Sequence, residues 1–132
     1  MKFMLLQDYG GVPEDVPPMT EWTPEEINTH ITYQKDLNAE LEERGEFVDA
    51  RGLTAPELAK FVVSDGSGSP VVTDGPFPES KELLAGYRLI DVESVERAIE
   101  IAAKGSAAPG PDGRPIKQVI EVRELMGPPI KH

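Results

Sequence analysis

The chain has 132 residues, and its 24 acidic against 13 basic side chains give a formal charge of −11 with both histidines neutral. The absence of cysteine excludes disulfides, thiolate metal sites and cysteine nucleophiles, and the acidic balance disfavours nucleic acid, because phosphates would be repelled. The longest apolar run near the start, residues 3–6, is too short for a signal sequence or a membrane span. We therefore expect one domain over residues 1–132, soluble and cytoplasmic, with no nucleic-acid or membrane partner.

The first third of the chain predicts a strand, a loop and a long helix. Residues 2–7 are dense in apolar side chains, as in a buried strand. Two glycines and three prolines interrupt regular structure over residues 10–20. The Thr-Pro-Glu-Glu motif that begins at Thr23 is typical of a helix start, so we predict a helix over residues 24–44 that ends at Gly45. Its predicted apolar face consists of Ile27, Ile31, Leu37 and Leu41.

The rest of the chain alternates short strands with one more helix. The predicted elements are strands over residues 47–53 and 60–64, a turn over 65–69, strands over 71–73 and 83–90, a helix over 93–104 and a strand over 116–125. The predicted inner face of the second helix consists of Val95, Ala98, Ile99 and Ala102. This order predicts a ferredoxin-like split βαβ fold of the α+β class, with an antiparallel sheet and an inserted β-hairpin.

Two helices on the same side of such a sheet cover only one of its faces. The first strand is nevertheless apolar on both sides, with Phe3 and Leu5 on one and Met4 and Leu6 on the other, and the strands at 61–63 and 83–90 repeat this pattern. We therefore predict a homodimer in which the uncovered faces pack together, since a bare sheet would expose too large an apolar patch. The alternative is that the Gly/Pro-rich loops fold over that face.

The segment over residues 71–82, Val-Val-Thr-Asp-Gly-Pro-Phe-Pro-Glu-Ser-Lys-Glu, closely resembles the signature of the DGPF proteins. These proteins are a branch of the YCII-related family. The resemblance extends to residues 2–6, 84–92, the helix containing Ala98, and 120–123. It implies the dimeric α+β barrel fold. Relatives with this fold include muconolactone isomerase-like enzymes and small monooxygenases, so an enzymatic activity is an analogy at the level of the fold.

Asp74 is the main catalytic candidate, in a ligand-binding loop with Gly75, Pro76 and Phe77. We expect Gly75 to allow a close backbone approach, Pro76 to force Gly75 into an extended conformation, and Phe77 to anchor the loop in the core. A carboxylate held beside an apolar barrel wall can have a raised pKa and act as a general acid or base. The alternative is that Asp74 only accepts backbone N–H bonds in an Asx turn.

His30 and Tyr87 are the assisting candidates. Some YCII-related proteins carry a histidine on the first helix, paired with an aspartate, so the resemblance implies a site role for His30; solvent exposure on the helix flank is the alternative. Tyr87 can donate a hydrogen bond to a ligand or simply line the barrel. In the same loop, Lys81 and Glu82 form an ion pair that fixes the loop, or Lys81 binds an anionic ligand.

Two functions remain open from the sequence. The first is a cofactor-free isomerase or lyase type of enzyme that acts on a neutral or cationic organic molecule, with Asp74 moving the proton. The second is a non-catalytic module that binds a small molecule or has a regulatory role, and the resemblance allows a link to sigma-factor-dependent transcription. No phosphate-binding loop and no pair of histidines at helical spacing is present in the sequence, so we expect neither a cofactor nor a metal.

Overall fold

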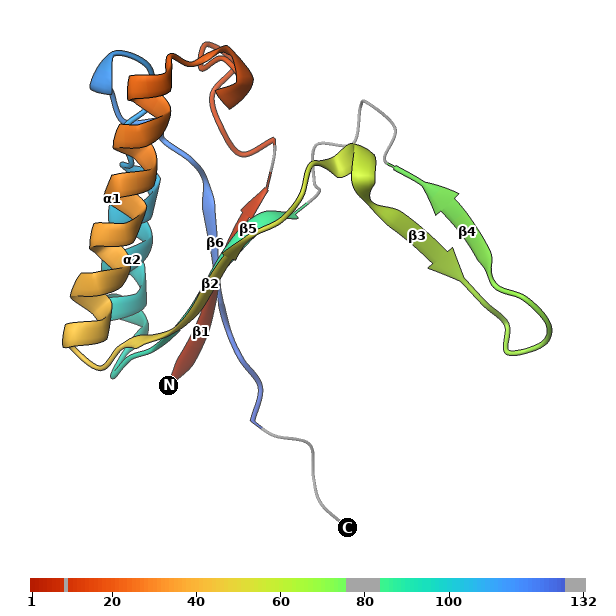
Figure 1. Ribbon diagram of the computed structural model, residues 1–132. Coiled ribbons are helices and arrows are strands. Elements are labelled where there is room, and N and C mark those ends of the chain that lie inside the picture. Colours follow the sequence, from red (N-terminus) through yellow and green to blue (C-terminus); the bar gives the residue numbers. More distant parts are fainter. Residues whose placement is uncertain (9, 76–83, 128–132) are drawn as a thin grey trace.

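The computed structural model describes residues 1–8, 10–75 and 84–127 (Figure 1). Its helices and strands are, in chain order, β1 (Lys2–Asp8), α1 (Pro24–Glu43), β2 (Phe47–Gly52), β3 (Lys60–Val63), β4 (Val71–Asp74), β5 (Leu84–Asp91), α2 (Val95–Ser106) and β6 (Ile120–Glu124). The predicted order of elements is confirmed. The last strand begins at Ile120 rather than at residue 116, because Ile116 is instead buried beneath the preceding loop, where it contacts Gly110.

Four of the strands form one antiparallel sheet in the order β2-β5-β1-β6. The crossovers through α1 and α2 leave β1 and β5 at the centre, as in the predicted split βαβ arrangement. Both α1 and α2 lie on one face of this sheet, and no α-helix of residues 1–8, 10–75 and 84–127 lies on the opposite face (Figure 1). The α+β ferredoxin-like fold is therefore confirmed. No helix in the described part of the chain has the length and apolar character needed to cross a bilayer.

The core lies between the sheet and the two helices. Alternate residues of the central strands, among them Phe3, Leu5 and Ile90, point toward the helices and are at most 3% exposed. Leu41 from α1 and Ile101 from α2 are fully buried against them. Side chains at the intervening strand positions therefore face the open side of the sheet.

The predicted start and end of α1 are confirmed. Thr23 Oγ1 accepts a hydrogen bond from the Glu26 N–H at 3.1 Å, and Glu26 Oε1 accepts one from the Thr23 N–H at 2.9 Å, so the capping box is complete. At the other end, Gly45 has a φ of +72°, a conformation that favours glycine, and stops the helix after Arg44.

The buried faces of both helices differ from the predicted ones. In α1, Leu37 and Leu41 are buried as predicted, but Ile31 is 43% exposed. In α2, Ile99 is 55% exposed and Ile101 is buried. The observed inner face of α2 follows the helical period strictly, through Ala98, Ile101, Ala102 and Gly105. The large isoleucine at position 99 therefore belongs to the solvent side, even though it is apolar.

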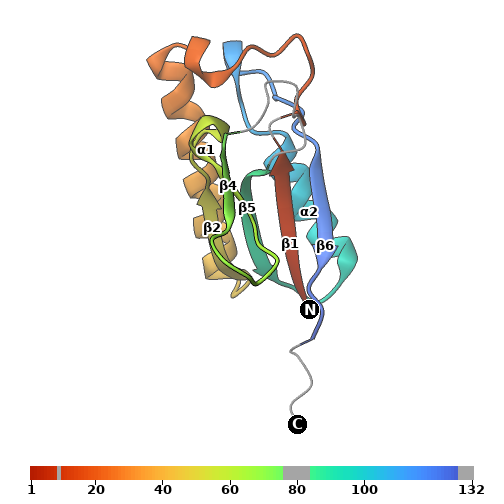
Figure 2. The same cartoon turned by 90° about the vertical axis from the view of Figure 1, so that its right-hand side faces the viewer.

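Strands β3 and β4 form a separate two-stranded sheet. They project from the side of the molecule opposite the helices, and they stand away from the four-stranded sheet (Figures 1 and 2). We call residues 60–74, which comprise these strands and their turn, the arm. The predicted contribution of residues 61–63 to a sheet with two apolar faces is thus wrong, because this strand pairs with β4 in a separate sheet rather than with the four-stranded one.

Candidate functional site

The open face of the four-stranded sheet has an apolar centre. Met4 lies opposite Leu89, and Leu6 lies opposite Tyr87, on the two central strands β1 and β5. All four side chains alternate with core-facing neighbours, so they point away from the helices, and all four are partly exposed. We call Met4, Leu6 and Leu89 the apolar strip. It corresponds to the part of the predicted uncovered apolar face that lies on the four-stranded sheet.

A polar group borders the strip on its β2 side. The Tyr87 hydroxyl donates a hydrogen bond to Asp49 Oδ2 at 2.9 Å, and Arg51 Nη1 lies 3.3 Å from Asp49 Oδ1. The pairing of β2 with β5 brings these residues together, because Asp49 lies opposite Leu89 and Arg51 lies opposite Tyr87. We call Asp49, Arg51 and Tyr87 the polar triad.

The hydrogen bond within the polar triad affects the pKa of Tyr87. The Asp49 carboxylate accepts this hydrogen bond from the phenol and holds the pKa of Tyr87 above its usual value of 10.0. Tyr87 therefore keeps its proton at neutral pH. Its oxygen still carries lone pairs, so Tyr87 is suited to orient a ligand by hydrogen bonding rather than to remove a proton from it.

On the other edge strand, β6, the open face is charged. Glu121 and Arg123 lie opposite Leu6 and Met4, respectively, and Arg123 Nε is 3.6 Å from Glu121 Oε2. Both side chains are more than half exposed. The apolar strip is thus bordered on each side by a carboxylate and a guanidinium of opposite charge.

Asp74 does not lie on this face. It ends β4, where it pairs in register with Lys60 and forms an ion pair with it, and its side chain is 80% exposed. The carboxylate is therefore in contact with water as well as with the Lys60 ammonium. Within the described residues, Asp74 holds the two strands of the arm together at their base.

Gly75 follows with a φ of +52°. The predicted extended conformation of Gly75 is therefore wrong. A Cβ at this position would lie 3.3 Å from the Glu57 carbonyl oxygen, and the Gly75 N–H donates to the Ala59 carbonyl at 2.7 Å, so the expected close backbone approach is confirmed. The other loop residues with a predicted role lie outside the described residues: Pro76, Phe77, Lys81 and Glu82.

His30 lies on the helix side of the molecule. Its Nδ1 is 2.9 Å from the Pro109 carbonyl oxygen, and its ring meets the ring of Trp22 edge-on, with centroids 5.4 Å apart. The ring is partly buried rather than free on the helix flank. Since a carbonyl oxygen can only accept, Nδ1 is the donor in this hydrogen bond. His30 thus ties α1 to the loop after α2.

The three predicted catalytic residues therefore occupy three different places. His30 contacts a loop on the helix side, Tyr87 belongs to the open sheet face, and Asp74 lies on the arm. Among the described residues, no hydrogen bond or ion pair joins any two of them. Asp49 and Arg51 were missed by the sequence analysis, since only strand pairing brings them to Tyr87.

A second polar cluster, also missed, surrounds Arg88 in the core. Arg88 is 5% exposed, and its Nε and Nη2 donate to Asn38 Oδ1 at 2.8 Å and Gln34 Oε1 at 2.7 Å. Burial lowers the pKa of Arg88. Gly105, in the last turn of α2, leaves room beside Nη1, and the partial negative charge of this helix end favours a cation there. The sequence signal that could have indicated this cluster is an arginine in an apolar strand, together with the side-chain amides of Gln34 and Asn38 four residues apart on α1.

A cavity of about 430 Å³ lies between two proline-rich loops, over residues 13–17 and 111–117. Asp15, Asp112, Arg114 and Lys117 contribute charges of both signs to its lining. None of the three predicted catalytic residues lines it. No cluster of three or more acidic or histidine side chains suited to a metal occurs in the described residues.

Comparison with known proteins gives one family and one relative. A family model described as the YCII-related domain matches residues 1–119. An uncharacterised protein of Rhizobium meliloti is 37% identical over 70 residues, which is 53% of this chain and 52% of that protein. The chain thus spans about half the length of this relative. The range matched by the family model includes the arm, both helices and every strand except β6.

Proposed function

Since this chain belongs to the family of YCII-related domains, we propose that it is a binding module for a small neutral organic molecule. The ligand lies on the open face of the four-stranded sheet, and a second copy of the chain encloses it there. The observation that carries this proposal is the juxtaposition of the apolar strip, formed by Met4, Leu6 and Leu89, with the polar triad.

The chemistry of the face favours a ligand with an apolar body and one or two hydrogen-bonding groups. The body would cover the methyl groups of the strip, which gain from removal from water. The Tyr87 oxygen and the free lone pairs of Asp49 can accept hydrogen bonds, and Arg51 can donate them. Because Asp49 and Arg51 have opposite charges, the triad favours a neutral ligand over an ion.

Enclosure by a second copy follows from the layer structure of the chain. A sheet that is apolar at its centre on both faces needs a covering layer on each side, and α1 and α2 supply only one (Figure 1). Two such faces turned toward each other across the bound ligand would exclude water from the strip. The homodimer is accordingly part of the proposal.

Binding is better supported than acid–base catalysis by Asp74. A general acid or base of the predicted kind needs a carboxylate withdrawn from water, whereas the Asp74 side chain is 80% exposed and paired with Lys60. Tyr87 keeps its proton. The groups on the open face are arranged to hold a molecule by its polar end, which is the task of a binding module.

The proposal is tested by methyl NMR with neutral probes, for which indole and benzamide are suitable. We expect the methyl signals of Met4, Leu6 and Leu89 to shift in a saturable way, while that of Ile99 on the outer side of α2 does not. Leu89→Gln should weaken probe binding at least tenfold, and the matched variant Ile99→Gln should leave it unchanged. Shifts centred instead on Val16 and Ile116 of the loop cavity, or no shifts at all, would overturn the proposal.

A further inference from the structure

The arm is an element without a core of its own. All eight residues of its two strands are exposed, and in the part of the chain that the structure describes, β3 and β4 pair with each other and with no further strand. A two-stranded hairpin is at best marginally stable in water unless it packs on something else. The arm nevertheless stands away from the sheet and the helices of its own chain (Figure 1).

Apolar side chains occur on both sides of the arm. The register places Val62 beside Val72 on one side, beyond the Lys60–Asp74 pair at the base, and Phe61, Val63 and Val71 on the other side with Thr73. These five side chains are between 42% and 70% exposed. A hairpin that is wetted on one side would carry polar residues along that side. In the two strands of the arm the charged pair is confined to the base, so the part nearer the turn has the composition of an element that is covered on both sides.

The arm and the open face of the sheet lie on the same side of the molecule (Figures 1 and 2). A single partner placed there would meet both surfaces. If that partner is a second copy related by a two-fold axis, each chain receives the arm of the other, and both unpartnered surfaces are covered by one interface.

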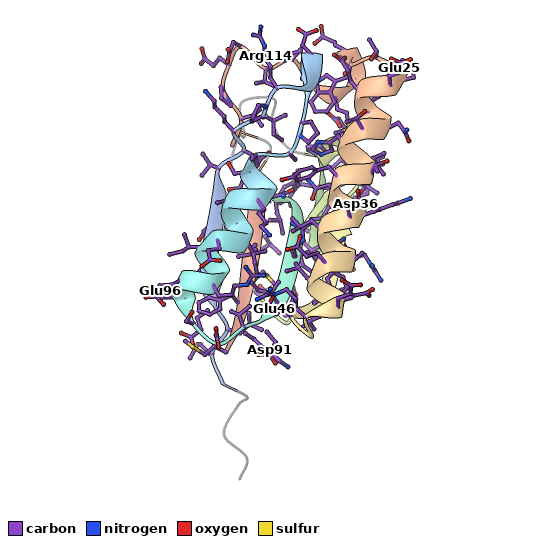
Figure 3. All side chains as sticks on the ribbon, turned by 90° about the vertical axis from the view of Figure 1, so that its left-hand side faces the viewer. Glu25, Asp36, Glu46, Asp91, Glu96 and Arg114 are labelled. Atoms are coloured by element: carbon purple, nitrogen blue, oxygen red, sulfur yellow. The ribbon has the colours of Figure 1, made fainter. Side chains whose placement is uncertain are left out.

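The charge distribution favours a second copy over a partner of opposite charge. Residues 60–74 contain one lysine and two aspartates, and on the open face Asp49 and Glu121 are matched by Arg51 and Arg123. This side is therefore close to neutral, although the chain as a whole carries −11. Acidic side chains such as Glu25, Asp36 and Glu96 lie on the helix side (Figure 3). Two copies of an acidic protein approach most easily through their neutral sides.

The area also fits. An exposed valine side chain offers on the order of 100 Å² of apolar surface. Because the four valines and Phe61 are 42% to 70% exposed, they would bury roughly 700 Å² on two arms, and the surface of the receiving chains would bring the total above roughly 1,000 Å², the lower end for specific interfaces. We propose that the arm is an intersubunit element, which packs against the second copy in a symmetric dimer. This inference relies on the homodimer in the proposed function but not on its ligand.

The test compares the self-association of the parent chain with that of two double variants, by light scattering and sedimentation at a series of concentrations. We expect the parent to have twice the chain mass of 14.4 kDa. Val62→Lys/Val72→Lys should raise the dimer Kd at least tenfold. The control, Ile31→Lys/Ile99→Lys, changes residues of α1 and α2 that are 43% and 55% exposed on the helix side of the molecule, and it should keep the parent Kd. All four positions are exposed, so the fold is retained, and far-UV circular dichroism verifies this.

Two results would overturn the inference: a parent chain that stays at the monomer mass at millimolar concentration, or a dimer whose Kd responds equally to both double variants. Direct contact is checked with a photo-crosslinking amino acid at position 72, which should link two copies, whereas the same group at position 99 should not. If indole and benzamide do not bind to the sheet face while the crosslink at position 72 still forms, the ligand proposal alone is contradicted.

Discussion

Arg97 holds the Glu46 carboxylate at two points, with Nε 2.9 Å from Oε2 and Nη2 2.9 Å from Oε1. The two side chains are only 11% and 12% exposed. Glu46, which is labelled in Figure 3, directly precedes β2. Arg97 lies in the first turn of α2, so the pair joins the start of the edge strand to the second helix. Such a two-point contact fixes direction as well as distance.

Glu46→Gln should destabilise the fold by about 2 kcal/mol, because the nearly buried guanidinium loses its charged partner. Urea denaturation measures the effect as a lower midpoint at unchanged slope. Glu100→Gln is the matched control, since Glu100 also pairs with Arg97 but is 65% exposed. Equal midpoints for the two variants would show that the two-point contact contributes nothing beyond a surface ion pair.

The same pair makes stability depend on pH. Hydrogen bonds from Arg97 lower the pKa of Glu46 below its usual value of 4.5. The stabilisation from Glu46 is therefore fully present above pH 4.5 and is lost as the pH falls through the pKa of the folded state. The difference in unfolding free energy between the parent and Glu46→Gln should narrow below pH 4.5. If the difference in unfolding free energy stayed constant down to pH 2, the pH dependence could not be attributed to the Glu46 carboxylate.

Arg88→Met should cost about 2 kcal/mol, because the oxygens of Gln34 and Asn38 lose their donor in a partly buried position. Adding Gln34→Leu and Asn38→Leu should return the stability to within about 1 kcal/mol of the parent, since an apolar cluster replaces a desolvated cation. Thermal and urea unfolding of both variants measure this. A triple variant no more stable than Arg88→Met would contradict the explanation.

Thr23→Ala should destabilise the chain by about 1 kcal/mol, because it removes the oxygen that accepts the Glu26 N–H. Thr23→Ser keeps that oxygen and should retain most of the stability. Urea unfolding separates the two variants. If Thr23→Ser were as unstable as Thr23→Ala, the stability lost in both variants would come from the Thr23 methyl group and not from the capping hydrogen bond.

Asp49→Asn should lower the pKa of Tyr87 toward 10.0, because the charged acceptor of its proton is removed. Titration of the Tyr87 ring carbon by NMR measures this value. Asp36→Asn on the helix side is the control and should leave the titration unchanged. In the parent, the Tyr87 contribution to stability is present below pH 10.0 and is lost as the pH rises through the folded-state pKa. An unchanged titration in Asp49→Asn would rule out the hydrogen bond within the polar triad.

The ends of α1 could be predicted from the sequence, because they depend on residues close together in the chain. The capping box at Thr23 and the stop at Gly45 depend on residues a few positions apart, so the helix between them follows from its own sequence. The order of strands and helices limited the topology to a ferredoxin-like sheet. The excess of apolar side chains on β1 indicated that both faces of the sheet need cover.

The candidate site was less predictable, because its members meet only through packing. Tyr87 and Asp49 are 38 positions apart, and Arg88 and Gln34 are 54 apart, so no local pattern connects them. For the same reason, periodicity alone could not distinguish Ile99 from Ile101 as the buried residue of α2.

By itself, then, the sequence determined the helices, the strands and their order, since hydrogen bonding along the chain and the spacing of apolar residues act over a few positions. Only the tertiary structure decided that β3 and β4 leave the sheet as an arm, with Asp74 on it, and that Asp49 and Arg51 join Tyr87. Strand pairing and register depend on contacts between distant segments, and those form only when the whole chain packs.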